Sequence, residues 1–157
     1  MGFCRVLGSS REFEAKGVIE MHKAESIAKA VKLGEKLQHV FVATADKRGM
    51  PHVAAASQIG VLPGGRVTVA AWFCPGTVTN LAQNKNVALV IWDERADTGY
   101  QLLGEVADTE ERAFMDGYAP ELEGQPPSPQ VERRLLIQVD KVLSFTHAPH
   151  SDAEDEA

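Results

Sequence analysis

The first regular pattern of apolar and polar positions along the chain predicts a helix over residues 23–37. The apolar positions fall near the 3.6-residue period of an α-helix, and lysines and glutamates lie mostly elsewhere on its circumference. These apolar positions are Ala24, Ile27, Ala28, Val31 and Leu37. Residues 1–22 are weakly patterned, and we expect an arm or a short edge strand there. The helix needs a sheet or barrel to cover.

Beyond this helix the pattern becomes that of β-strands. Runs of β-forming residues separated by turn-like clusters predict six strands. We place them at about residues 39–45, 51–59, 66–73, 86–93, 100–107 and 135–145. The clusters at 46–49 and 62–65 both contain glycine, which reaches the positive φ that tight turns demand. Most of the links are short, which favours antiparallel pairing.

Two further helices are expected between the strands. A short one begins at Thr77, directly after Pro75 and Gly76 end the third strand. Asp108 stands three residues before Glu111, as in a capping box, and this spacing predicts a helix over 108–118. A proline-rich loop at 124–129 and an acidic tail at 148–157 are expected to lack regular structure.

This order of elements favours a mainly β fold, a six-stranded antiparallel barrel with flanking helices. The strands at 39–45 and 86–92 are almost continuously apolar, although a barrel wall facing water should alternate. Their outer faces therefore need a cover. We expect the helix over 23–37 to cover one of them and a second subunit to cover the other, which predicts a homodimer.

Composition and charge narrow the class of protein. A length of 157 residues predicts one domain, which we assign to 23–147, between an arm at 1–22 and the tail at 148–157. The formal net charge is −6 and no run of lysine or arginine occurs, which argues against nucleic-acid binding. No apolar run is long enough to span a bilayer, so no membrane contact is expected.

The two cysteines indicate a cytoplasmic protein. Cys4 and Cys74 lie far apart and form no C-x-x-C pair, so neither a disulfide framework nor a cysteine-based zinc site is expected. Histidines are scattered, and His147 and His150 lie three apart in the expected tail without a third ligand. We therefore predict no metal site, and no side chain stands out as catalytic.

Two segments of the sequence carry a resemblance to a known family. Residues 46–53 read DKRGMPHV, an acidic residue followed by G-x-P and a strand of small residues, and residues 77–89 read TVTNLAQNKNVAL. In this order and spacing they resemble the FMN-binding split barrels related to pyridoxamine 5′-phosphate oxidase, over about residues 23–146. The resemblance implies a six-stranded split barrel, bound FMN, and a homodimer with the cofactor at the subunit interface.

The start of the short helix is the candidate phosphate site. The first N–H groups of a helix lack internal partners and lie at the positive end of its dipole, so they stabilise an anion. The resemblance implies phosphate contacts from Thr77, Val78, Thr79 and Asn80. The alternative is that Thr77 only caps the helix and that Asn80 faces solvent. Many members of the family have a lysine or arginine in this segment, whereas this chain has threonine and valine.

A candidate site for the flavin ring follows from the same resemblance, along the second and third strands. Small alanines there would let a flat ring approach the backbone, although they could equally pack beneath the helix. The residues concerned are Ala55, Ala56, Ser57, Ala71 and Trp72, with Gln101 contributed by the second subunit. Lys85 and Arg66 are the nearest cations along the chain, and neither stands at a position that matches the family.

The sequence therefore leaves two functions open. The first is an FMN-binding flavoprotein, an oxidoreductase in electron or hydride transfer whose substrate the residues do not reveal. The flavin would do the chemistry, while the protein supplies binding, orientation and electrostatics. The second is a non-enzymatic split-barrel dimer that has lost flavin or binds another planar ligand, haem or a deazaflavin. The missing basic residue at 77–79 favours the second.

Overall fold

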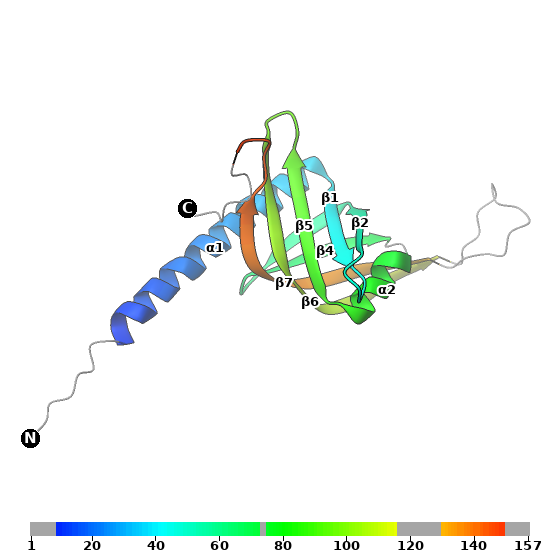
Figure 1. The fold of residues 1–157 in the computed structure, drawn as a ribbon, viewed down its shortest axis with the longest axis horizontal. Coiled ribbons are helices and arrows are strands. Elements are labelled where there is room, and N and C mark those ends of the chain that lie inside the picture. Colours follow the sequence, from blue (N-terminus) through cyan, green and yellow to red (C-terminus); the bar gives the residue numbers. More distant parts are fainter. Residues whose placement is uncertain (1–8, 73–74, 116–129, 150–157) are drawn as a thin grey trace, which may run out of the picture.

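A computed structural model describes residues 9–72, 75–115 and 130–149 of the chain. Within these ranges the chain forms two helices and seven strands (Figure 1). In chain order the elements are α1 (Ser9–Leu37), β1 (Val40–Ala45), β2 (Pro51–Ala56), β3 (Gln58–Leu62), β4 (Arg66–Trp72), α2 (Pro75–Gln83), β5 (Asn86–Asp93), β6 (Thr98–Met115) and β7 (Gln130–Ser144). The strand predicted at 86–93 is confirmed to the residue.

All seven strands belong to one antiparallel sheet, in the order β2-β1-β5-β6-β7-β4-β3. The sheet curls into a half-barrel, which confirms the predicted mainly β split-barrel class (Figure 1). The count is seven rather than six because the strand expected at 51–59 is broken at Ser57. Its first half pairs with β1 at one edge of the sheet, and its second half pairs with β4 at the other. The two edge strands of the sheet, β2 and β3, are therefore consecutive in the sequence.

Alternation along the strands separates the inner face of the curled sheet from its outer face. On β1, Val40 and Val42 are fully buried, whereas Phe41 between them is 40% exposed. Leu89 and Ile91 on β5 and Ile137 on β7 are buried in the same core. The inner face therefore forms the hydrophobic core, and the outer face remains at the surface of the single chain.

Helix α1 packs against the inner face, not against an outer face as the sequence pattern suggested. Ile27, Ala30 and Val31 are buried in the core cluster. A Cβ on Gly34 would lie 2.7 Å from Ile59 Cγ2 and 3.4 Å from Val40 Cγ2, which are inner side chains. The prediction that this helix covers an outer face is therefore wrong, because the inner row of the curled sheet also needs a cover.

Helix α1 also begins at Ser9, fourteen residues before the predicted start near 23, so the short edge strand considered before it is wrong from Ser9 onward. Its N-terminal half extends away from the barrel (Figure 1), and Val18, Ile19 and Met21 there are 48%, 67% and 64% exposed. A helix that buries no face leaves no apolar period in the sequence, so periodicity detected only the packed half. The predicted end of the helix, at Leu37, is confirmed.

The helix predicted over 108–118 is wrong as far as residue 115, because β6 continues through it to Met115. There β6 pairs with an equally extended β7, which begins at Gln130 rather than near 135. Glu110 and Glu111 lie opposite Arg134 and Arg133, and such cross-strand pairs of opposite charge support a strand. Residues 116–118, the loop at 124–129 and the tail from 150 lie outside the described residues.

Neither of the two helices in the described part of the chain combines the length and the apolar character needed to cross a membrane.

Candidate functional site

At the start of α2, where the sequence predicted a phosphate site, the ring of a histidine from β2 lies against the helix. Pro75 is the first helical residue, a position where its missing N–H costs nothing. The ring of His52 on β2 lies against the next residue, because a Cβ on Gly76 would be only 3.2 Å from His52 Nε2. Thr77 is fully buried, and its Oγ1 lies 3.4 Å from His52 Nδ1. The side chain of Thr77 is thus turned into the protein.

Asn80 is also turned inward. It is 8% exposed, and its Nδ2 donates a hydrogen bond of 3.1 Å to Thr44 Oγ1 on the inner face of β1. The alternative in which Asn80 faces solvent is therefore wrong. Thr79 is exposed and Val78 is half-buried. The polar side chains of Thr77 and Asn80 hold α2 on the barrel, which leaves the backbone N–H groups and the hydroxyl of the exposed Thr79 as the donors that this turn offers an anion.

A pocket of about 220 Å³ lies along one side of α2. Its wall combines apolar side chains with hydroxyl groups and one cation. The lining residues are Thr77, Val78, Leu81 and Ala82 from α2, Thr109 from β6, and Arg133 and Leu135 from β7. This mixture suits a ligand that has both an anionic group and an apolar part.

Arg133 brings to the pocket the positive charge that the sequence segment 77–80 lacks. It pairs with β4 at Ala71, so it lies beside the strand that leads into α2. Its side chain is 21% exposed, and its Nη2 lies 3.5 Å from Glu111 Oε1. The cations considered from the sequence do not line this pocket. Arg66 donates from Nε to Pro63 O at the turn before β4, and Lys85 is exposed after α2.

The alanines predicted to lie beneath a flavin ring are divided between two environments. Ala56 and Ala71 are buried in the core, whereas Ala55 is exposed on the outer face. Ser57 is exposed at the break between β2 and β3. The backbone of Trp72 ends β4, and its side chain lies outside the described part of the structure. The structure therefore does not bring these residues together on one surface of a single chain.

Gln101 lies on the outer face, in a lateral row with Ala55. The row runs from Ala55 to Phe41, Val90 and Gln101, each directly opposite the next on a neighbouring strand. Three strand spacings separate its two ends, or roughly 14 Å. Gln101 does not line the pocket beside α2 of its own chain. A role for it in that pocket requires a second copy, as the sequence analysis expected.

The outer face around this row is apolar. Phe41 is 40% exposed and Val53 is 60% exposed, and Met50 in the turn before β2 is 63% exposed. Val90 and Trp92 continue the surface on β5. No helix in the described residues packs over this face, since the buried contacts of α1 lie on the inner one. This surface has the character of an interface.

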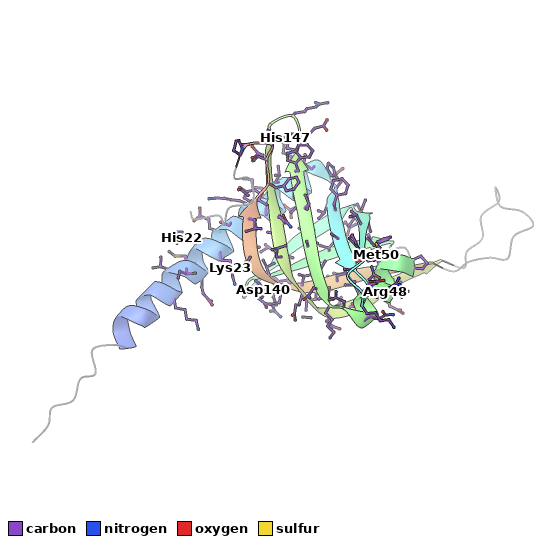
Figure 2. All side chains as sticks on the ribbon, in the orientation of Figure 1. His22, Lys23, Arg48, Met50, Asp140 and His147 are labelled. Atoms are coloured by element: carbon purple, nitrogen blue, oxygen red, sulfur yellow. The ribbon has the colours of Figure 1, made fainter. Side chains whose placement is uncertain are left out.

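Electrostatics at the turn before β2 stabilise its shape. Asp46 Oδ1 accepts hydrogen bonds from the backbone N–H groups of Arg48 and Met50, at 2.8 and 2.9 Å. These bonds, that from Met50 first, lower the pKa of Asp46 below its ordinary value. Figure 2 shows Arg48 and Met50 at the end of the sheet near α2. Asp46 therefore shapes the hairpin that presents His52.

Sequence reasoning missed three residues at this site, Arg133, Thr109 and His52. A helix was expected over 108–118, where the structure has β6. This strand carries Thr109 and pairs with β7, which carries Arg133, so the expected helix concealed both residues. The charge pattern could have revealed them, since two glutamates followed later by two arginines match an antiparallel ladder. The inward row of β2, on which His52 lies opposite Thr44, follows from alternation along 51–56.

Comparison with known proteins gives the chain a family context. Residues 27–143 match the family model described as pyridoxamine 5′-phosphate oxidase. No curated protein sequence matches the chain.

Three solved structures show the same fold at low sequence identity. An FMN-binding protein from Syntrophomonas wolfei is 15% identical, with a TM-score of 0.59, over 88% of this chain and 98% of that one. HupZ from Group A Streptococcus is 17% identical, with a TM-score of 0.53, over 80% and 97%. An F420 reductase is 15% identical, with a TM-score of 0.50, over 71% and 93%.

Proposed function

This chain belongs to the pyridoxamine 5′-phosphate oxidase family, as its sequence segments indicated, and from that premise we propose that it is an FMN-binding oxidoreductase. One observation carries the proposal. The pocket beside α2 joins a partly buried arginine and Thr109 to an apolar wall, which is the chemistry that a phosphate linked to a ribityl chain requires. The solved FMN-binding protein of the same fold supports it.

Arg133 is the residue that we expect to hold the phosphate, with Thr109 and the first N–H groups of α2 as neutral donors. A guanidinium forms charge-assisted hydrogen bonds, about twice as strong as neutral ones, and so replaces the cation that relatives have near position 77. Leu81 and Leu135 would exclude water from the chain beyond the phosphate. When bound, the flavin would supply electron or hydride transfer.

The proposal includes a homodimer with the cofactor at the subunit interface, in the cytoplasm. The pocket of about 220 Å³ in one chain is smaller than the roughly 300–1,000 Å³ of ordinary small-molecule sites. The apolar outer face, which holds Gln101 and Ala55, offers the rest of the surface from a second copy. The proposed contacts of Ala56, Ser57, Ala71 and Trp72 with the ring remain predictions.

The second candidate function is a dimer that does not bind FMN. It is favoured by two polar side chains of α2 that contact other residues of the protein. The hydroxyl of Thr77 lies near His52 and the amide of Asn80 donates to Thr44, so neither is directed to a phosphate. Such a protein could hold a deazaflavin instead, and the F420 reductase has the same fold. Haem is the other planar ligand in this group of alternatives.

The visible spectrum of the purified protein tests the proposal. We expect a yellow protein that releases FMN on denaturation, and an apoprotein that binds added FMN. Arg133→Gln should weaken FMN binding about tenfold or more, because a hydrogen bond to a charged group contributes about 1.5–3 kcal/mol. Fluorescence titration with FMN measures this.

Arg134→Gln is the matched control, because Arg134 is the next residue on the same strand and pairs with Glu110 rather than lining the pocket. We expect it to bind FMN like the wild type. A colourless protein that does not bind FMN would overturn the proposal, and binding of F420 or haem by that protein would support the second candidate. Equal losses in the two arginine variants would remove Arg133 from the phosphate site.

A further inference from the structure

The ladder that β6 and β7 form near α2 has two faces, and one of them borders the pocket (Figure 1). Thr109 lies directly opposite Leu135, and both residues line the pocket. Side chains alternate between the two faces of a strand, so residues that are two positions apart share a face. Glu111 and Arg133, which also lie directly opposite each other, are therefore on the pocket face.

The opposite face of the same ladder carries a second pair of the same residue types. Glu110 and Arg134 are the adjacent residues on the two strands, and neither lines the pocket. Nε and Nη2 of Arg134 both donate to Glu110 Oε2, and the bond from Nε is 2.9 Å long. By contrast, Nη2 of Arg133 lies 3.5 Å from Glu111 Oε1. The ion pair on the pocket face is therefore the looser of the two.

The two partners on the pocket face differ in burial. The side chain of Arg133 is 21% exposed, whereas that of Glu111 is 69% exposed and does not line the pocket. The carboxylate thus reaches the guanidinium from the solvent side. A guanidinium presents several N–H donors in a fixed fork, which suits the bidentate hydrogen bonds that a phosphate accepts. A phosphate inside the pocket would be a better partner for Arg133 than Glu111 is.

We propose that Glu111 competes with the phosphate of the ligand for Arg133, and so limits the affinity of the pocket for doubly charged phosphate esters. The inference rests on the proposed function, which places a phosphate at Arg133. In the structure the carboxylate offsets the charge of the guanidinium. A phosphate that replaces it on Arg133 would lie close to this carboxylate, and the like charges would repel each other.

The charge balance of the pocket depends on these two residues. Among the described residues, Arg133 is the only charged one that lines the pocket, and Glu111 is its carboxylate partner across the ladder. A change at Glu111 that removes its charge should therefore alter the affinity for an anion and leave the affinity for a neutral ligand unchanged.

Glu111→Gln tests the proposal, because glutamine keeps an oxygen that can accept from Arg133 and removes only the charge. We expect the variant to bind FMN about two- to fivefold more tightly than the wild type, since one exposed carboxylate contributes a small, screened interaction. Riboflavin lacks the phosphate, so its affinity should not change. Fluorescence titration measures both affinities. Glu110→Gln is the matched control on the opposite face, and it should bind both flavins as the wild type does.

An FMN affinity that is unchanged or weaker in Glu111→Gln would overturn the proposal, as would an equal gain for riboflavin or in Glu110→Gln. A wild type that does not bind FMN would contradict the proposed function, and inorganic phosphate is then the probe. The reporter is the guanidinium N–H resonance of Arg133 in NMR spectra, assigned by its loss in Arg133→Gln. Tighter binding of phosphate by Glu111→Gln would still support the inference, whereas a resonance that does not respond to phosphate in either protein would overturn it.

Discussion

At the scale of single residues, function and packing compete for the same side chains. Thr77 and Asn80 are polar residues at a helix start, where the sequence predicts contact with an anion, yet their partners are His52 and Thr44. A pattern of residue types shows which groups could bind a phosphate, but the side-chain direction depends on which strand lies beneath the helix. Arg133 shows the converse, because its place in the pocket depends on a pairing between β6 and β7 that local sequence concealed.

The turn at Asp46 was predictable from the sequence, and it leads to a prediction about pH. The pKa of Asp46 is lowered in the folded protein, chiefly by the N–H of Met50, so its ionised form contributes stability above the unfolded pKa of about 4. This contribution is lost as the pH falls through the lower pKa of the folded state. Asp46→Asn should therefore be less stable than the wild type near pH 7, by a margin that shrinks towards about pH 3. Urea denaturation at several pH values measures this margin, and a constant margin would contradict the prediction.

At the scale of elements, the pattern predicted those strands and helix faces that bury one side. The strand at 86–93 follows from its almost continuous run of apolar residues, and the end of α1 at Leu37 follows from apolar periodicity. Residues 16–20 of α1 and 107–111 of β6 are exposed, so burial leaves no apolar period to detect there. The capping-box spacing of Asp108 and Glu111 predicted a helix wrongly, because both residues pair with residues of β7 in a β-ladder.

The packing of α1 depends on a glycine. At Gly34 a methyl group would meet Ile59 Cγ2 at 2.7 Å, so Gly34→Ala should destabilise the protein by about 1–3 kcal/mol through overpacking, despite alanine's better helix propensity. Gly17→Ala in the same helix is the control, since no atom outside the immediate helix lies within 4 Å of its Cβ. It should leave stability unchanged or raise it slightly. Urea denaturation compares the two, and equal effects would show that α1 does not pack closely at Gly34.

At the scale of the whole molecule, the curl of the sheet leaves a large surface that neither helix of the described residues covers. Val40 and Thr44 point inward, where α1 and α2 pack, and this inward row explains why the continuous apolar run on β1 did not require a helix outside. The outward side chains of the same strand and its neighbours, Phe41 among them, therefore stay exposed and available to another partner. The sequence assigned the helix to the wrong face, and the second subunit that it predicted as the other cover stays a prediction.

Association through that surface gives the last prediction, on the outer face at Val53, which is 60% exposed. If the proposed homodimer forms there, Val53→Glu should yield folded monomers in light scattering after gel filtration, because a charge on each copy would be buried in the interface. Val61→Glu, at a 52% exposed site on β3, should remain dimeric. If the cofactor site is shared between subunits, the Val53 variant should also lose FMN in parallel with its dimer. Dimers that persist in Val53→Glu would show that the interface lies elsewhere. A monomeric wild type would contradict the homodimer, and the pocket beside α2 would then bind its ligand with residues of one chain alone.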